Sequence, residues 1–366
     1  MNVLFTGGGS LGPVTPLLAV VRALRRLEPT VSCTWVGTPE GPEKELVQAL
    51  HIPFFPLPVA KLPRYPTVRW LYFPFDWYRA RKEATRLIAQ LHPDVIVTAG
   101  GFTGVPLMMA ARKQKTLCAL HQLDLKLSLS NRQIASLCQS ITTSFEYERS
   151  PFRTELADER IPTPTRFRLE TLPTRTSAVH HFGLDAARPV TLIFGGGTGS
   201  LAINTLVEKT LASWLSFTQV IHVTGKGKRS STLPVRPGYK VFELLTDEME
   251  LAIAAADLVV SRAGFGTLSE ISAALQKPTI VIPLPGTEQE LNAKAFEEQG
   301  AVIVMYQEEL GTGDQLLESA RLVLHDKQLR SEMGRAATAF LPTDDGTTLA
   351  KRLIALYERR ERGEGK

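Results

Sequence analysis

Two stretches of this chain open in the same way, with a short apolar strand that runs into a cluster of glycines. The first strand, residues 2–5, leads into glycines at 7–9, and the second, residues 190–194, leads into glycines at 195–197. In both series, helical patterns then alternate with further short apolar strands. This alternation is typical of parallel, doubly wound sheets. The sequence therefore predicts an α/β protein with two Rossmann-like domains.

The chain offers one clear boundary between the two series. Its 366 residues suit about two domains. Residues 150–176, rich in proline, threonine and arginine, predict the linker. We therefore expect a first domain over residues 1–165 and a second over 166–344. A charged helical pattern follows, and we expect a helix within 345–366 to pack back on the first domain.

Composition and charge narrow the class of protein. Hydrophobic residues make up 43% and charged residues 22%, which fits a globular protein, and no apolar run is long enough to predict a membrane span. Cys33, Cys118 and Cys138 lack the spacing of a zinc site or a disulfide framework, which favours a cytoplasmic setting. The net charge of +5 fits either a solvated basic surface or attraction to phosphates and anionic membranes.

The most informative run is residues 261–270. A strand ends at Ser261, glycines follow, and a helical pattern starts around Thr267. The N-terminus of a helix presents free N–H groups and a partial positive charge, which suit a diphosphate. Glu270 would lie in the first turn, where a carboxylate can accept hydrogen bonds from ribose hydroxyls. The alternative is an ordinary helix cap with a glutamate that the helix dipole favours.

Two further segments of the second half suit the same kind of ligand. Residues 194–200 form another strand-to-helix glycine loop, although its spacing matches neither the dinucleotide fingerprint nor a P-loop. Gln289 and Asn292 follow a third strand, and such amides suit recognition of sugar hydroxyls. Together the three segments predict a site for a nucleotide sugar.

The order of these motifs resembles the MurG family of bacterial glycosyltransferases. The family's first glycine loop is matched by residues 8–16 and its second by residues 100–106. Its His-Glu-Gln-Asn segment is similar to residues 121–124, with Asn131 at the expected later spacing. The similarity covers nearly the whole chain and is strongest in residues 239–305. It implies the GT-B fold, in which two Rossmann-like domains face each other across a cleft.

The resemblance also implies an activity. Such an enzyme would transfer N-acetylglucosamine from UDP-N-acetylglucosamine to lipid I, the undecaprenyl-diphosphate-linked MurNAc-pentapeptide, and so make lipid II for peptidoglycan. The reaction would be inverting and would take place at the cytoplasmic face of the cell membrane. Three alternatives stay open: a GT-B glycosyltransferase with a different lipid acceptor, a UDP-N-acetylglucosamine 2-epimerase, and a non-catalytic UDP-sugar-binding protein.

Carried over residue by residue, the resemblance assigns a donor side and an acceptor side. The implied donor residues are Arg175, Gly197, Thr198, Gly199, Leu245, Thr246, Arg262, Ala263, Gly264, Thr267, Glu270, Gln289 and Asn292. The implied acceptor-side residues are Ser10, Gly12, Gly101, Phe102, Thr103 and Asn131.

The general base has to be chosen among few residues. Pro13 and Gln122 stand where the family has a histidine and a glutamate, and neither can take a proton. The ionisable groups left in the matching segment are His121 and Asp124, after a predicted strand, where open α/β sheets place ligands. We expect Asp124 to be the base, because a loop carboxylate can reach a ligand. His121 is then a second catalytic candidate or a structural histidine that holds the loop.

The chain contains no Asp-x-Asp pair, which GT-A transferases use to hold a divalent ion on the diphosphate. We therefore expect neither a metal ion nor a cofactor. The departing UDP would then be neutralised by helix N-termini and by Arg175.

Residues 62–82 interleave basic and aromatic side chains. Such a mixture suits the headgroup zone of a bilayer and predicts binding to an anionic membrane surface. The alternative is a helix whose aromatic side chains lie in the core. Stacking on nucleic-acid bases is a third interpretation, but no RNA-binding motif accompanies the segment, and we expect no nucleic-acid partner. The residues concerned are Arg64, Tyr65, Arg69, Trp70, Tyr72, Phe73, Phe75, Trp77, Tyr78, Arg79, Arg81 and Lys82.

Overall fold

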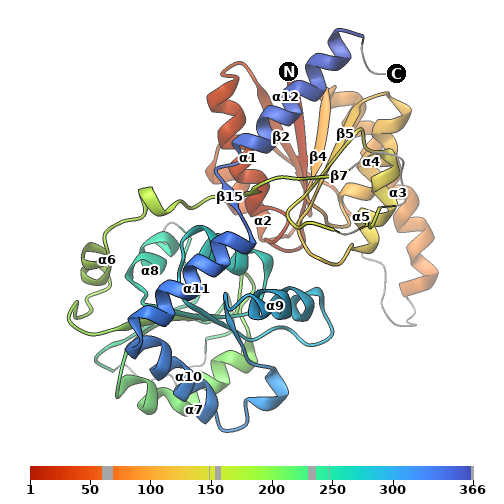
Figure 1. The fold of residues 1–366 in the computed structure, drawn as a ribbon. Helices are drawn as coiled ribbons and strands as arrows, with labels where there is room; N and C mark the ends of the chain where they lie inside the picture. The colour runs from red at the N-terminus through yellow and green to blue at the C-terminus, as the bar shows by residue number, and fades with distance from the viewer. Residues whose placement is uncertain (60–68, 148, 153–157, 230–235, 247, 364–366) are drawn as a thin grey trace. The chain divides into compact units, whose positions relative to one another are not determined.

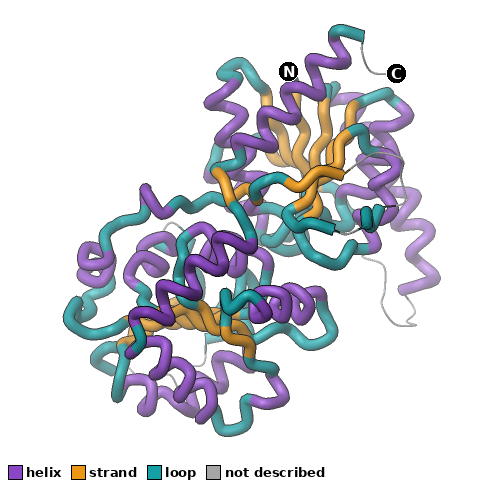
Figure 2. The backbone as a smooth tube through the Cα atoms, in the orientation of Figure 1, coloured by secondary structure: helices purple, strands orange, loops and turns teal. Residues whose placement is uncertain are grey.

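The computed structural model describes residues 1–366 apart from 60–68, 148, 153–157, 230–235, 247 and 364–366. The chain divides into two units. The first unit comprises Met1–Arg166 together with Asp344–Lys366, and the second unit comprises Phe167–Thr343. Each unit has its own parallel sheet with helices packed around it (Figure 1 and Figure 2). The prediction of an α/β protein with two doubly wound sheets is confirmed.

The sheet of the first unit has the strand order β3-β2-β1-β4-β5-β6-β7, and neighbouring strands run parallel. The order reverses beside β1, since β2 lies on one side of it and β4 on the other. Ligands of open α/β sheets bind at such a point, outside the carboxyl ends of the strands. The strands are β1 (Asn2–Thr6), β2 (Ser32–Gly37), β3 (Phe54–Pro56), β4 (Val95–Thr98), β5 (Leu117–Gln122), β6 (Ser140–Thr143) and β7 (Asp158–Arg160).

The helices of the first unit include one from the end of the chain. Helix α12 packs along α1, and Arg26 of α1 donates to the hydroxyl of Thr347 in α12 at 2.6 Å. Arg26 also forms an ion pair at 2.8 Å with Asp345, which lies just before α12. The backbone N–H of Thr165 donates to the carbonyl of Asp344 at 2.8 Å, which fixes the point where the chain returns. The helices are α1 (Thr15–Leu27), α2 (Glu43–Ala49), α3 (Arg69–Leu91), α4 (Gly104–Lys113), α5 (Leu129–Ile134), η1 (Ala135–Leu137) and α12 (Thr347–Glu361). A short two-stranded sheet pairs β8 (Thr163–Pro164) with β15 (Thr343–Asp344).

The sheet of the second unit has the strand order β11-β10-β9-β12-β13-β14, and its neighbouring strands are also parallel. Its central strand β9 is buried along its whole length because helices cover both faces. Alternate side chains of β9 enter two different cores, with Leu192 in one and Ile193 in the other. The strands are β9 (Val190–Phe194), β10 (Gln219–Val223), β11 (Tyr239–Phe242), β12 (Leu258–Ser261), β13 (Thr279–Val281) and β14 (Ile303–Val304).

The helices of the second unit follow most of these strands in turn. One of them, η3, has the wide turns of a π-helix. The helices are η2 (Leu169–Thr171), α6 (Arg175–His181), α7 (Leu201–Leu215), α8 (Met249–Ala255), η3 (Thr267–Ala274), α9 (Glu288–Glu298), η4 (Gln307–Glu309), α10 (Asp314–His325) and α11 (Lys327–Phe340).

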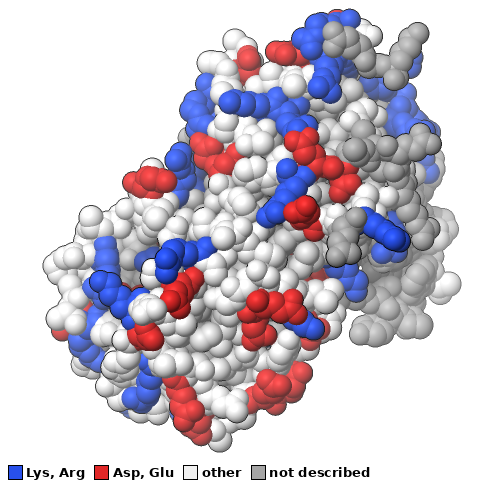
Figure 3. Space-filling model, viewed as in Figure 1, with Lys and Arg blue, Asp and Glu red and all other residues white. Residues whose placement is uncertain are grey.

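The surface mixes charges of both signs. On the face seen in Figure 3, blue and red side chains are interspersed, so the net charge of +5 does not gather into one basic patch there. Among the helices of the described residues, none is long and apolar enough to cross a bilayer.

Candidate active site

The carboxyl edge of the second sheet gathers most of the residues that the sequence assigns to the donor. Because β9, β12 and β13 are parallel neighbours, the segments that follow them meet at one edge. Leu245 and Thr246 follow β11 at the same edge, the former buried and the latter exposed. The residues after the three neighbouring strands are Gly197, Thr198 and Gly199, then Arg262, Ala263 and Gly264, then Gln289 and Asn292.

The glycine loop after β9 is too tight for side chains. Gly199 has a φ of +72°, and a Cβ built on it would lie 2.2 Å from the carbonyl oxygen of Thr224. A Cβ on Gly195 would lie 2.1 Å from the backbone nitrogen of Ser200. Ser200 caps α7, since its hydroxyl accepts from the backbone N–H of Ile203 at 3.4 Å. The loop thus brings the N-terminus of a helix to the carboxyl edge, as a diphosphate site requires.

Arg262 joins the three loops to one another. Its guanidinium donates to the carbonyl oxygens of Ile282 and Pro283 at 3.1 and 3.0 Å. It also donates to the hydroxyl of Ser200 at 3.0 Å and to the side-chain oxygen of Gln307 at 2.6 Å. The side chain is buried, and burial lowers its pKa. The sequence assigns Arg262 to the donor, but its guanidinium binds protein oxygens, so Arg262 shapes the loops instead of reaching a ligand.

Thr267 and Glu270 lie at the start of η3. The hydroxyl of Thr267 is 3.2 Å from that of Ser261, which fastens the helix to the end of β12. Glu270 lies in the first turn and is 4% exposed. A Cβ on Gly264 would meet no atom within 4 Å, so space is open beside this turn. The placement fits the expected donor site, and contact of Glu270 with a ribose stays a prediction.

The amide residues of α9 lie after β13. The side-chain oxygen of Gln289 accepts from the backbone N–H of Leu284 at 3.1 Å. The hydroxyl of Thr287 caps the helix by accepting from the backbone N–H of Gln289 at 3.3 Å. Asn292 follows one turn later and is 1% exposed. Gln289 therefore fixes the turn into α9, and Asn292 is a buried residue of that helix.

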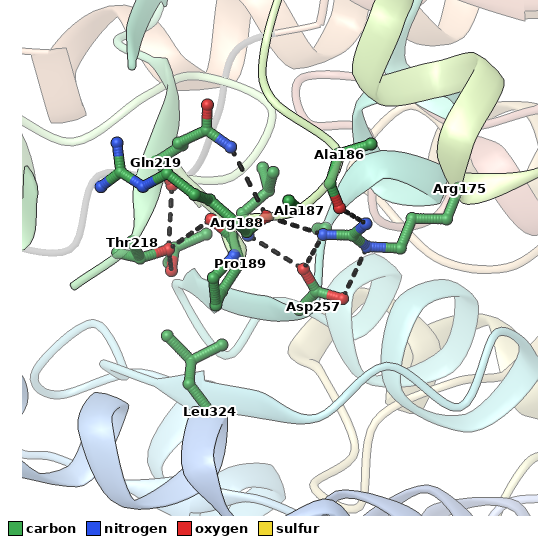
Figure 4. Close-up of polar contacts among 12 residues, drawn as sticks. Arg175, Ala186, Ala187, Arg188, Pro189, Thr218, Gln219, Asp257 and Leu324 are labelled. Carbon is green, nitrogen blue, oxygen red and sulfur yellow. Dashed lines mark hydrogen bonds and ion pairs between the residues drawn. The ribbon is translucent and has the colours of Figure 1, made fainter. Parts of the chain in front are cut away.

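The prediction that Arg175 binds the donor is wrong, because the structure places Arg175 away from the donor loops. Its guanidinium forms a two-bond ion pair with Asp257, at 2.8 and 2.7 Å, and donates to the carbonyls of Ala186 and Arg188, each at 2.9 Å (Figure 4). Asp257 directly precedes β12, and Arg188 lies just before β9. Because both strands run away from these residues, Arg175 lies at the amino edge of the sheet. The donor loops lie at the opposite edge.

On the acceptor side, the first two glycine loops pack against each other. They follow β1 and β4, which are parallel neighbours. Gly9 has a φ of +78°, and a Cβ on it would lie 2.8 Å from Cε1 of Phe102. A Cβ on Gly101 would lie 3.4 Å from the carbonyl oxygen of Gly8. The two loops therefore lie in close contact.

The remaining residues of these loops divide into two kinds. Ser10 is exposed, and a Cβ on Gly12 would meet no atom within 4 Å, so both border open space. Thr103 is fully buried, and its hydroxyl accepts from that of Thr6 at 3.4 Å. The sequence assigns Thr103 to the acceptor, but its side chain holds the second loop to β1.

His121 is a structural histidine. Its side chain is fully buried, with Nδ1 2.9 Å from the hydroxyl of Thr142 and Nε2 3.2 Å from that of Ser144. Burial lowers its pKa to about 3. An imidazole with both nitrogens engaged and so low a pKa cannot take a proton from a substrate near neutral pH. The prediction of a catalytic role for His121 is therefore wrong, and the structural alternative holds.

Asp124 lies on a loop that two amides support. The amide nitrogen of Gln122 donates to the carbonyl of Asp124 at 2.6 Å, and that of Asn131 donates to the side-chain oxygen of Gln122 at 2.6 Å. Asp124 itself is half-buried. The side-chain oxygen of Asn131 is buried and has no hydrogen-bond partner among the described residues. Asp124 is therefore a partly accessible residue on a loop that Gln122 and Asn131 hold in place.

A polar network beneath the donor loop escaped the sequence reasoning. The amide nitrogen of Asn204 donates to the carbonyls of Thr224 and Lys228 at 3.0 and 3.2 Å, and its oxygen is 3.1 Å from Nε2 of His222. Burial lowers the pKa of His222 to about 4. The ammonium of Lys228 donates to the carbonyl of Gly199 at 3.1 Å. The available signal was His222 between the apolar residues Ile221 and Val223 of β10.

The aromatic residues of α3 lie on two faces. The rings of Phe73 and Trp77 stack 6.2 Å apart, and Trp77 packs against the core of the first unit. A second set is strongly exposed, and the basic residues Arg79 and Lys82 are exposed beside it. Arg64 and Tyr65 lie outside the described residues, as do the side chains of Arg69 and Trp70. The exposed set is Leu71, Tyr72, Phe75 and Tyr78, with 63–73% of each side chain accessible.

Comparison with known proteins agrees with this geometry. The model of the glycosyltransferase family 28 N-terminal domain matches residues 3–143, and that of the family 28 C-terminal domain matches residues 190–345. The crystal structure of Acinetobacter baumannii MurG superposes with a TM-score of 0.70 at 22% identity and covers 97% of this chain and 99% of that one. A UDP-GlcNAc 2-epimerase from Neisseria meningitidis gives a TM-score of 0.69 at 13% identity, covering 97% and 100%. The two family models, together with the GT-B fold, thus define a glycosyltransferase of the GT-B class.

Curated relatives define the family more closely. A protein of Lachnoclostridium phytofermentans is 34% identical over 89% of this chain and 92% of its own length, and one of Nocardioides sp. is 34% identical over 97% and 98%. Both are named UDP-N-acetylglucosamine–N-acetylmuramyl-(pentapeptide) pyrophosphoryl-undecaprenol N-acetylglucosamine transferase. The chain belongs to glycosyltransferase family 28, in the branch that these transferases represent.

Proposed function

We propose that this glycosyltransferase moves N-acetylglucosamine from UDP-N-acetylglucosamine to lipid I and so makes lipid II for peptidoglycan. The observation that carries this proposal is the shared name of relatives that match nearly the full length of the chain at 34% identity. The donor and acceptor in that name suit the two sets of loops, each at the carboxyl edge of its own sheet.

The second unit would bind the donor. The N-termini of α7 and η3 suit the diphosphate, because a helix start offers free N–H groups and partial positive charge. Glu270, in the first turn of η3, would accept hydrogen bonds from the ribose. Gln289 and Asn292 follow the neighbouring strand and would recognise the sugar.

The departing UDP needs positive charge, and Arg175 lies at the wrong edge of the sheet to supply it. Lys228 is better placed, because its ammonium already reaches the carbonyl of Gly199 in the donor loop. Together with the two helix N-termini it would stabilise the charge that develops on the leaving diphosphate. On this basis the transfer would proceed without a metal ion.

The first unit would bind the acceptor and hold the general base. In an inverting transfer, the acceptor hydroxyl attacks the anomeric carbon as UDP departs, and a nearby base takes the hydroxyl proton. Asp124 remains the candidate, because it is partly accessible while His121 is buried and Gln122 cannot accept a proton. Asn131 would hold this segment in place, because its amide nitrogen donates to the side chain of Gln122.

A lipid-linked acceptor requires contact with a membrane, and the exposed set on α3 suits it. Tyr72, Phe75 and Tyr78 recur at helical spacing with Leu71, and each exposes an aromatic or aliphatic surface. The neighbouring Arg79 and Lys82 would meet anionic headgroups. The protein would therefore bind peripherally at the cytoplasmic face of the cell membrane, where this helix enters the headgroup zone.

The test is a transfer assay with radiolabelled UDP-sugars and lipid I in detergent micelles. We expect label from UDP-N-acetylglucosamine in the lipid fraction and much less from UDP-glucose or UDP-galactose. A parallel reaction without lipid I would reveal the epimer that a 2-epimerase forms. UDP binding without transfer to lipid I would refute the proposal and favour another acceptor or a non-catalytic binder.

A further inference from the structure

A glutamate outside all the matched motifs holds the first glycine loop. Glu43, the first residue of α2, is fully buried. One carboxylate oxygen accepts from the backbone N–H of Thr38 at 2.7 Å and from its hydroxyl at 2.5 Å. The other accepts from the backbone N–H of Gly9 at 3.2 Å. A single side chain thus joins the segment after β2 to the loop after β1.

The glycines around Glu43 leave room for its carboxylate alone. A Cβ on Gly8 would lie 2.1 Å from Oε1 of Glu43, and a Cβ on Gly41 would lie 2.0 Å from Oε2. On its other side the loop presses on Phe102, which a Cβ on Gly9 would approach to 2.8 Å. The carboxylate therefore sets the position of the first loop, and through Gly9 it also affects the second.

The loop that Glu43 holds is the one with an open side. Ser10 is exposed, and Gly12 borders open space. A carboxylate removed from water needs strong hydrogen bonds to offset the cost of its burial. At Glu43 two of these bonds come from backbone N–H groups that fix loop geometry. The indole nitrogen of Trp35 donates to the carbonyl of Gly7 at 3.1 Å and anchors the start of the same loop.

We propose that Glu43 is a positioning residue for the acceptor. It holds the loop of residues 7–12 in the shape that binds the lipid-linked substrate, and it touches neither substrate nor reacting atoms. The proposal rests on the proposed function, because it takes the first unit to be the acceptor side. Glu43→Gln tests it with nearly the same side-chain volume, since the amide NH₂ cannot accept from an N–H and one of the contacts must break.

We expect Glu43→Gln to change the kinetics for the acceptor and to leave binding of the donor nucleotide nearly unchanged. Glu43→Gln should raise the KM for lipid I roughly tenfold, the effect of losing about one hydrogen bond to a charged group. The kcat and the Kd for UDP should change less than about twofold, because the donor loops lie in the other unit. Glu40→Gln is the matched control, since Glu40 is exposed three residues away and its loss removes the same charge.

A second readout does not depend on the acceptor. Hydrogen exchange of the Gly9 amide should speed up in Glu43→Gln and stay native in Glu40→Gln, as measured by mass spectrometry of a peptide covering residues 5–14. Faster exchange with an unchanged KM for lipid I would overturn the positioning role. Native exchange would overturn the claim that Glu43 holds the loop. A native protein that transfers nothing to lipid I would defeat the proposed function and leave the exchange result standing.

If Glu43→Gln fails to fold, Gly8→Ala disturbs the same contact from the side of the loop. Its Cβ would displace Oε1 of Glu43, so the KM for lipid I should rise in the same way. In folded proteins, the double variant should be little worse than either single one, because both changes break one interaction. Fully additive losses would contradict the shared mechanism.

Discussion

Arg175→Met should destabilise the second unit while leaving UDP binding intact. The guanidinium makes two bonds to Asp257 and one each to the carbonyls of Ala186 and Arg188. Hydrogen bonds to charged groups contribute about 1.5–3 kcal/mol each when buried. Because Arg175 is 33% exposed and Asp257 24%, water screens part of this, and we expect a total loss of about 2–3 kcal/mol. For a unit of this size, that lowers the unfolding temperature by roughly 5–10 °C.

The assay combines calorimetric unfolding with titration of UDP. The matched control is Arg168→Met, since the ion pair of Arg168 with Glu170 has side chains that are 50% and 71% exposed and should contribute nothing measurable. A folded Arg175→Met protein with native stability and tenfold weaker UDP binding would refute the reasoning. That result would instead support the prediction that Arg175 binds the donor.

Other predictions concern the site, the core and the membrane. Glu270→Ala should weaken UDP binding by about 1–3 kcal/mol in calorimetry, since it removes a buried hydrogen-bonding partner; unchanged affinity would contradict the ribose assignment. Asp124→Asn should lower turnover by about 10²–10⁴-fold with UDP affinity retained; a native rate would place the base elsewhere. Burial lowers the pKa of His121 to about 3, well below the usual value of about 6.5 for histidine, so the unfolded chain takes up the proton first as the pH falls. Lowering the pH from 7 to 5 should therefore cost the first unit about 2 kcal/mol, and urea titrations of His121→Gln should lack that part of the slope. Serine at Tyr72, Phe75 and Tyr78 should release the protein from anionic vesicles in sedimentation, whereas serine at the core residue Trp77 should mainly destabilise the first unit.

The donor edge could be predicted from the sequence because parallel sheets follow a simple rule. Strands that alternate with helices all place their carboxyl ends at one edge, so the residues after each strand must meet there. Gly199 and Gly264 each follow a recognisable strand, and their meeting needs no knowledge of side-chain packing. The same rule located Asp124 after β5.

The errors share a physical cause: a local stretch of sequence does not show toward which part of the fold a side chain points. Arg175 follows the linker, but its partner Asp257 lies 82 residues away and decides which edge it occupies. His121 stands next to the strand end, yet its side chain turns inward to Thr142 on the neighbouring strand. The composition of residues 62–82 likewise could not show which aromatic rings face the core.

Glu43 shows another limit of a single sequence. A glutamate between glycines and prolines on the way into a short helix is most often exposed. Its burial follows from the absence of side chains on Gly8 and Gly41, which are close to it only in the fold. Nothing in local periodicity signals that arrangement.

The return of the chain to the first unit has a consequence for biosynthesis. The second unit is one continuous stretch, so it can fold as soon as residues 167–343 have left the ribosome. The first unit is interrupted, and α1 has to wait for α12, which is translated about 320 residues later, before its outer face is covered. Until α12 has been translated, the first unit would therefore expose an apolar face of α1. A released chain that is truncated after residue 343 should hold a folded second unit and bind chaperones through α1.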